Sequence, residues 1–155
     1  MLIFKALHIL SMFTMIAVFL GGETFWTVAV WRRDVGLLAS LHDLEAQNRI
    51  PQLGLVALVL GIVFGLLAVA TGGFDFFAGW LITAYLLIAA FFVNVAVTGL
   101  QLIRLSEEAV EAKAGKRSVD EVVRHMAERR GPLLFFPINV VIFTLIILDM
   151  VLKPF

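Results

Sequence analysis

Among the ionisable side chains in the long apolar stretch at the start of the sequence, His8 and Glu23 are the two whose positions need the most explanation. A neutral imidazole is inexpensive to bury and is a common axial ligand of haem iron. His8 is therefore a candidate axial ligand of a haem iron. Met150 is the predicted partner of His8 at this site, because it has a similar depth in the last apolar stretch. One alternative stays open, in which His8 is a packed residue that is hydrogen bonded to Asp149 or Ser11.

Glu23 poses a different problem, because a carboxylate inside a membrane costs at least about 2.5 kcal/mol on insertion scales. It should find a partner, take a proton or touch a water-filled cavity. One hypothesis makes it a proton-carrying or ligand-binding group. The other makes it a structural residue, hydrogen bonded to Asn139 or Gln101 or reaching Arg32 or Arg33 near the membrane surface.

Further hydrogen-bonding residues recur at helical spacing in the third and fourth apolar stretches. Three of them in the third stretch are four and three residues apart, so they share one face of a helix. In the fourth stretch, Asn139 shares a face with Met150, because eleven residues at about 100° each nearly complete whole turns. Polar side chains in lipid mark the protein interior. We therefore predict a polar interior made of Glu23, Asn94, Thr98, Gln101 and Asn139.

The elements that position these residues are long apolar helices. The chain has 155 residues, of which 61% are hydrophobic, and its mean hydropathy is +1.01; a soluble domain has about 45–50% apolar residues. About 20 apolar residues cross a membrane, and four stretches qualify, at about 2–30, 51–70, 79–103 and 132–152. We predict an all-α protein, an antiparallel four-helix membrane bundle in a single domain over 1–155. There is no cysteine, which excludes disulfides and thiolate metal sites.

Small residues mark one face of the second apolar stretch, where Gly61 and Gly65 form a G-x-x-x-G step. Such a step lets two helix backbones approach closely. We predict helix–helix association through these two glycines. Packing inside the bundle and homodimerisation both remain open.

The basic residues predict the orientation in the membrane. Ten of the twelve lysine and arginine residues lie in the connections at 31–50 and 104–131. By the positive-inside rule, both termini are then on the non-cytoplasmic side of a bacterial-type inner (plasma) membrane. The longer connection contains SVDE at 118–121, a capping box that predicts an amphipathic cytoplasmic helix over about 118–130. Its apolar stripe would rest on the membrane surface or on the bundle.

The sequence KALHIL near the start and MVLKPF at the end carry a family resemblance. The chain resembles an uncharacterised four-helix integral membrane family related to the copper-resistance CopD type, and more distantly the HemJ-type protoporphyrinogen oxidases. In these families a first-span histidine follows a K-x-x-H pattern, and HemJ-type chains also end in KPF. The resemblance implies a haem b site at His8, with porphyrin oxidation or copper handling as inherited activities.

The chain departs from both families at positions that matter for activity. HemJ-type proteins carry basic or histidine residues around the third span and N-E-x-P at the start of the fourth. Here the third span has no such residue, and the fourth begins GPLLFFPIN. Copper handling would need several Met, His or Cys ligands outside the membrane. Only Met1, His8 and Met150 lie near that surface.

The leading functional prediction is therefore a haem b protein of membrane electron transfer that exchanges electrons with a quinone or a partner protein. A first alternative is a non-catalytic accessory subunit of a larger membrane complex. A second alternative is a HemJ-like protoporphyrinogen oxidase. With twelve basic and twelve acidic residues, the charge gives no indication of a nucleic-acid partner.

Overall fold

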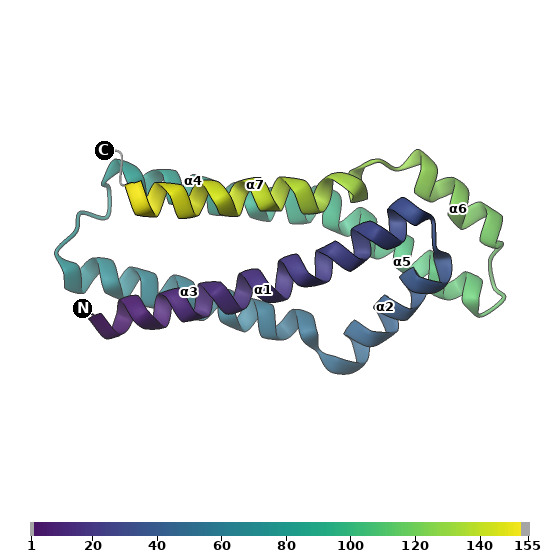
Figure 1. Cartoon of the computed structure of the whole chain (residues 1–155), viewed down its shortest axis with the longest axis horizontal. Coiled ribbons are helices and arrows are strands. Elements are labelled where there is room, and N and C mark those ends of the chain that lie inside the picture. Colours follow the sequence, from purple (N-terminus) through teal and green to yellow (C-terminus); the bar gives the residue numbers. More distant parts are fainter. Residues whose placement is uncertain (1, 153–155) are drawn as a thin grey trace.

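The computed structural model describes residues 2–152 as a bundle of helices with short connections (Figure 1). Four helical segments are long and apolar enough to cross a membrane: Leu2–Arg32 (α1), Ile50–Gly72 (α3), Gly79–Lys113 (α4, η1 and α5) and Gly131–Leu152 (α7). They run alternately in opposite directions (Figure 1). The predicted all-α membrane fold is thus confirmed, and residues 2–152 contain no strand.

The helices form two pairs, because α1 packs along α3 and α4 packs along α7. In Figure 1 the pairs lie apart on the left and converge toward the right, where α1 crosses to α7. The left side holds Leu2, Leu152 and the connection at 73–78, and we name it the terminal end. The right side holds α2 (Val35–Asn48), α5 (Leu100–Lys113) and α6 (Val119–Glu128). We name it the basic end, since ten of the twelve lysine and arginine residues fall in 32–130.

The third membrane segment is longer than predicted. Helix α4 (Gly79–Asn94) passes into one wide π-helical turn, η1 (Val95–Gly99), and continues as α5 to Lys113. The predicted span ended at residue 103. The helix continues because apolar residues keep recurring at helical spacing and pack into the core of the basic end, namely Leu102, Leu105, Ala109 and Ala112.

The first connection, expected as a loop, contains the helix α2. Asp34 caps its first turn, accepting a hydrogen bond from the backbone N–H of Leu37 at 2.8 Å. The helix ends at Arg49, whose left-handed backbone (φ 52°) turns the chain into α3. Pro51 then occupies the first turn of α3, where its missing N–H costs nothing.

The predicted capping box at 118–121 does not form. Helix α6 begins after Ser118 as expected, but the Ser118 side chain makes no capping hydrogen bond. Val122 and Met126 hold the helix instead, because both are buried in the core cluster of the basic end. The apolar stripe of α6 therefore rests on the bundle, against α5 and α2.

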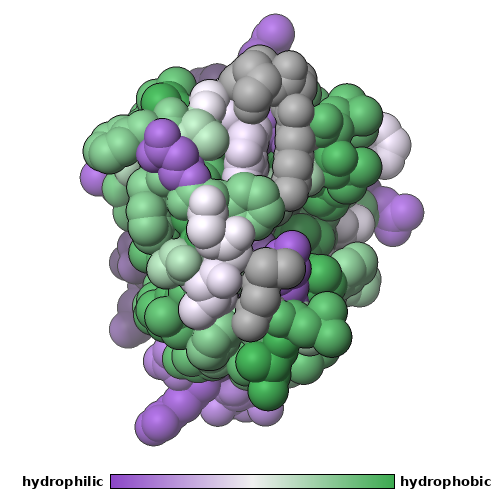
Figure 2. Space-filling model, turned by 90° about the vertical axis from the view of Figure 1, so that its left-hand side faces the viewer, coloured by the Kyte–Doolittle hydropathy of each residue, from purple (hydrophilic) through white to green (hydrophobic). Residues whose placement is uncertain are grey.

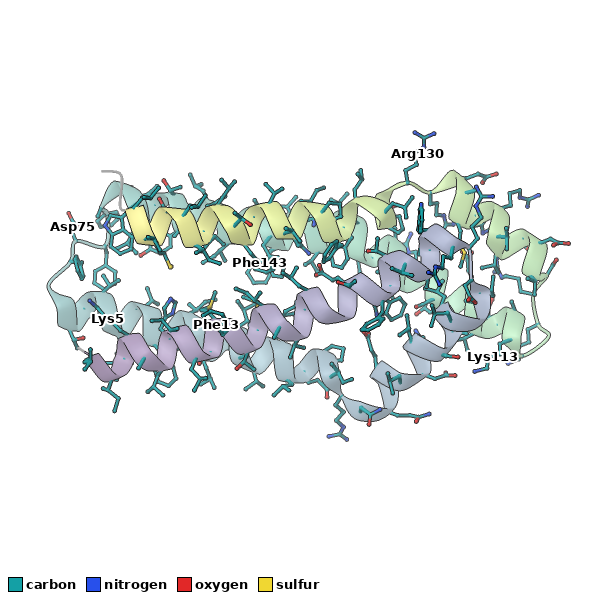
Figure 3. All side chains as sticks on the ribbon, in the orientation of Figure 1. Lys5, Phe13, Asp75, Lys113, Arg130 and Phe143 are labelled. Atoms are coloured by element: carbon teal, nitrogen blue, oxygen red, sulfur yellow. The ribbon has the colours of Figure 1, made fainter. Side chains whose placement is uncertain are left out.

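A second core cluster lies nearer the middle of the membrane segments. It brings together Met15 of α1, Leu58 of α3, Phe91 of α4 and Phe143 of α7. The rings of Phe91 and Phe143 are 5.2 Å apart between centroids, and Figure 3 shows Phe143 on α7. Figure 2, which looks onto the terminal end, shows hydrophobic residues over both flanks of the molecule. These flanks face lipid, because many large apolar side chains of the membrane segments are exposed.

Candidate functional site

A continuous chain of buried polar side chains links three membrane helices. Asn139 of α7 donates from its amide nitrogen to Oε1 of Glu23 at 2.8 Å. Asn94 of α4 donates to Oδ1 of Asn139, also at 2.8 Å. Thr98 donates to the Asn94 side chain at 2.9 Å. All four residues are at most 6% exposed, so the chain is shielded from lipid and from water.

The directions of these hydrogen bonds are determined by a backbone carbonyl. The Phe135 carbonyl oxygen can only accept, so Asn94 turns its amide nitrogen toward it at 3.2 Å. The same nitrogen also donates to Oδ1 of Asn139. Asn139 must then present its own nitrogen to Glu23. Every donor in the chain therefore points toward the carboxyl group.

A wide helical turn lies directly beside this chain. The π-helical turn η1 follows Asn94 and contains Thr98 and Gly99. A Cβ atom at Gly99 would lie 3.3 Å from the Phe135 ring, so glycine permits the close approach of α7. Single π-helical turns inside α-helices occur frequently at functional sites. The turn coincides here with the hydrogen-bonded chain and with a cleft.

The cleft has a volume of about 500 Å³ and lies toward the basic end, between α1, α2, the start of α3, η1, α5 and Phe135 of α7. This volume is within the range of small-molecule sites, which are mostly apolar with a few polar groups. Glu23 forms part of its wall. Much of the remaining lining is apolar and includes Val18, Phe19, Trp26, Ile50, Pro51, Val95, Leu102, Ile103 and Phe135.

Two further polar pairs line the cleft near α2. Trp26 donates from its indole nitrogen to Oε1 of Glu45 at 2.6 Å. Burial raises the pKa of the Glu45 carboxyl, although the hydrogen bond from Trp26 and the charge of His42 act in the opposite direction. Nδ1 of His42 lies 2.9 Å from the Ser106 hydroxyl, which itself donates to the carbonyl of Ile103.

Sequence reasoning did not assign these four residues to the site. Trp26 and Glu45 are 19 positions apart, and His42 and Ser106 are 64 positions apart. The available signal was the helix α2 itself. Asp34 as a capping residue, followed by VGLLASLHDL, predicts a helix in which His42 and Glu45 share a face.

Three buried side-chain oxygen atoms in residues 2–152 have no hydrogen-bond partner: Oε2 of Glu23, Oγ1 of Thr27 and Oδ2 of Asp149. Glu23 is 4% exposed and is the one of the three that lines the cleft. A buried polar atom without a partner is costly and calls for a ligand, a water molecule or a proton acceptor. Glu23 is therefore the centre of the candidate site.

His8 lies elsewhere, between α1 and α3. Its Nδ1 is 2.7 Å from the carbonyl oxygen of Gly61. A Cβ atom at Gly65 would lie 2.9 Å from the same nitrogen, so the ring fills the space left by Gly65, while Met12 fills the space left by Gly61. This face of α3 is thus occupied by the chain's own first helix and is not available for homodimerisation. Neither Ser11 nor Asp149 is the partner of Nδ1.

The two remaining predicted residues lie apart from the hydrogen-bonded chain. Met150 is half-buried on α7 and packs against the same cluster as Met12 of α1. Gln101 is half-buried and lies against Gly131, where a Cβ atom would collide with its amide. Within residues 2–152, no group of three His, Cys, Asp or Glu side chains is arranged to hold a metal ion.

Comparison with known proteins places the chain in a family. No curated protein and no solved structure matches it. Nothing in the comparisons links it to the CopD or HemJ types. The family described as "Predicted integral membrane protein (DUF2269)" matches residues 2–154. Because this match covers almost the whole sequence, the chain belongs to that family of integral membrane proteins.

Proposed function

We propose that this protein binds a lipid-soluble small molecule in the cleft beside Glu23 and serves in membrane electron transfer. The observation that supports it is the combination of an apolar cleft of about 500 Å³ with a buried carboxyl group whose second oxygen has no partner. The molecule reaches the cleft from the bilayer, because most of the lining residues belong to the membrane segments and the lining is mainly apolar.

The distribution of charge supports a proposed orientation in the membrane and, with it, a proposed leaflet for the cleft. The positive-inside rule assigns the basic end to the cytoplasmic side of the inner membrane, with both termini outside. The cleft then opens in the cytoplasmic half of the membrane. A quinone is the redox molecule with the matching solubility, so short-chain quinones are the first probes.

Tryptophan fluorescence tests ligand binding. Trp26 lines the cleft, and the other two tryptophans can be replaced as Trp31→Phe and Trp80→Phe. In lipid nanodiscs, a decyl-benzoquinone is expected to quench Trp26 with a saturable dependence on concentration. A linear dependence, as for simple partitioning into lipid, would contradict the proposal.

Two neighbouring glycines supply a matched pair of variants. Gly22 lines the cleft, and a Cβ atom there meets only Oε1 of Glu45, at 3.6 Å. Gly21 is exposed, and a Cβ atom there meets nothing within 4 Å. Gly22→Leu should fill the cleft and abolish saturable quenching, whereas Gly21→Leu should leave it unchanged. Equal quenching in both variants would place the quinone outside the cleft.

Haem b binding at His8 is a second candidate function, and one hydrogen bond favours it. The Gly61 carbonyl only accepts, so the ring proton lies on Nδ1 and the lone pair of Nε2 remains for iron. A metal-binding histidine commonly donates its other N–H in this way. His8 would therefore hold the iron through Nε2, with Met150 as the proposed second ligand. Bound haem would supply one-electron transfer.

An absorption spectrum tests the haem proposal. After expression with sufficient haem, the purified protein should show a Soret band that shifts on reduction. The other two histidines of the sequence supply the controls. His8→Ala should remove the band, whereas His42→Ala and His125→Ala should keep it. Absence of the band in the unmodified protein, or its survival in His8→Ala, would refute the assignment.

The alternatives predicted from sequence have their own tests. A HemJ-like enzyme would restore growth to a strain that lacks protoporphyrinogen oxidase. An accessory subunit would remain with a larger complex in native mass measurement after gentle extraction. It would not use the Gly61 and Gly65 face, because His8 and Met12 already fill it.

A further inference from the structure

We propose that Glu23 recognises the ligand of the cleft as a carboxylic acid, donating a hydrogen bond from Oε2 to a carbonyl oxygen of a quinone-type ring. This inference rests on the proposed function, because it concerns the molecule that occupies the same cleft. It adds the identity of the recognising atom and the chemical group that the ligand presents.

The hydrogen-bonded chain assigns different roles to the two carboxyl oxygens. Oε1 accepts a hydrogen bond from the amide nitrogen of Asn139. The Phe135 carbonyl determines the orientation of the Asn139 amide through Asn94. Oε1 is therefore an acceptor and corresponds to the C=O oxygen of an acid. If the group carries a proton, the proton is on Oε2.

The surroundings of Glu23 favour the protonated form. Helix α7 presents the neutral amide of Asn139 to it, and the next group in the chain, Asn94 of α4, is a neutral amide as well. Among the described residues, no ion pair involves Glu23. A buried charge without an opposite charge is far more costly than a neutral acid.

The charged and titratable groups of the cleft are on α2 and at its end. Glu45 is hydrogen bonded to Trp26, His42 lies beside the Ser106 hydroxyl, and Arg49 is exposed. None of these groups forms a hydrogen bond or ion pair with Oε2, since that atom has no partner. The acid is thus left with one unused donor.

The donor and the lining together define the ligand class. An unused O–H in an apolar wall is stabilised by an acceptor that is itself easy to bury, and a ring carbonyl is such an acceptor. A phosphate headgroup or an ammonium group would bring a charge into the apolar cleft. Oε2 is covered in the structure, so the wall has to shift slightly before a carbonyl oxygen reaches it.

Two substitutions of Glu23 test the inference. Both are made in the variant with Trp31→Phe and Trp80→Phe, in which Trp26 is the single tryptophan. Glu23→Gln retains an acceptor for Asn139 and places an N–H donor where the O–H was, so the affinity for decyl-benzoquinone should stay within about threefold. Glu23→Leu has a similar size but no donor, so the affinity should fall by about tenfold or more. Size-exclusion profiles and helical content confirm that each variant is folded.

The outcomes distinguish a failure of the role of Glu23 from a failure of the proposed quinone site. Unchanged affinity in Glu23→Leu would refute the role of Glu23 while the cleft remains a quinone site. Equal losses in the two folded variants would show that the recognised form is the carboxylate. No saturable binding in the unmodified protein would overturn the proposed function as well.

Infrared difference spectra supply a measurement that does not depend on the leucine variant. In the unmodified protein, binding of the quinone should shift the C=O band of a protonated carboxyl group. The shift should be absent in Glu23→Gln. A shift in a carboxylate band instead would contradict the inference.

Discussion

At the residue scale, Asn139 is the junction of the buried polar chain. Its amide nitrogen donates a hydrogen bond to Glu23 and its Oδ1 accepts one from Asn94, so one side chain joins α1, α4 and α7. It is completely buried, with 0% of its surface exposed. No water molecule can replace it without entering the packed core.

Replacement of Asn139 by leucine is therefore expected to destabilise the bundle. Hydrogen bonds between membrane helices are worth about 0.6 kcal/mol on average. Here two buried groups lose a partner at once, so the expected loss is about 1–2 kcal/mol in the free energy of unfolding. Unfolding in mixed detergent micelles measures it. The control is Asn48→Leu, whose side chain is exposed on α2, and a similar loss in both variants would contradict the expectation.

The glycine pair of α3 leads to a less obvious prediction. A Cβ atom at Gly61 would lie 2.6 Å from the Met12 sulfur, and one at Gly65 would lie 2.9 Å from Nδ1 of His8. The thioether is flexible, whereas the imidazole is held by the Gly61 carbonyl. Gly65→Ala should thus cost more than Gly61→Ala, by about 1 kcal/mol or more.

The same unfolding measurement applies to this pair. Gly21→Ala is the control, because its Cβ atom would meet nothing within 4 Å. Alanine is the better helix former, so this control should stabilise the protein by up to about 1 kcal/mol. A greater loss in Gly61→Ala than in Gly65→Ala would show that the His8 ring is free to move.

At the element scale, one carboxylate attaches α6 to α5. Glu108 of α5 accepts from Nδ1 of His125 at 2.7 Å, and Arg129 and Arg117 lie at 3.3 and 3.9 Å. The Glu108 side chain is 14% exposed. Glu111, one turn later, is 50% exposed and pairs with Arg117 at 3.1 Å.

Hydrogen exchange can separate these two carboxylates. Glu108→Gln should speed amide exchange in α6, because hydrogen bonds to a charged group are worth about 1.5–3 kcal/mol. Glu111→Gln should change it far less, since exposed ion pairs contribute little. Unaltered exchange in Glu108→Gln would mean that Val122 and Met126 hold α6 without the charges.

The elements also show how far the sequence predicts the fold. Apolar length predicted four membrane helices, because lipid permits few other structures. It could not predict the end of α5, since LSEEAVEAK reads as a polar connection until its apolar residues are seen to pack on α2 and α6. The π-helical turn at Val95–Gly99 has no sequence pattern of its own.

The sequence also predicts only part of the candidate site. Helical spacing predicted a shared face for Asn94 and Thr98, because both lie on one continuous helix. Trp26 and Glu45 meet only through the turn at Arg33 and Asp34, which folds α2 back toward α1. A contact that depends on such a turn cannot be read from spacing.

At the scale of the whole molecule, charge is segregated along the long axis. Figure 3 shows Lys113 and Arg130 at the basic end, and Lys5 and Asp75 at the terminal end. The two helix pairs converge toward the basic end (Figure 1). The cleft is lined partly by α2 and α5, which belong to that end. The orientation of the bundle therefore decides which leaflet would supply the proposed ligand.

Cysteine labelling in intact cells tests this orientation, because the natural chain has no cysteine. Asp75 and Lys113 are exposed at opposite ends. The hydrogen bond that Asp75 accepts from the backbone N–H of Phe77 and the ion pair of Lys113 with Asp43 are also exposed, so replacement at either position should cost little. A membrane-impermeant maleimide should label Asp75→Cys in intact cells and Lys113→Cys only after lysis. The reverse pattern would place the basic end outside the cytoplasm. The cleft would then take its ligand from the outer leaflet, and a redox partner would have to act from that side.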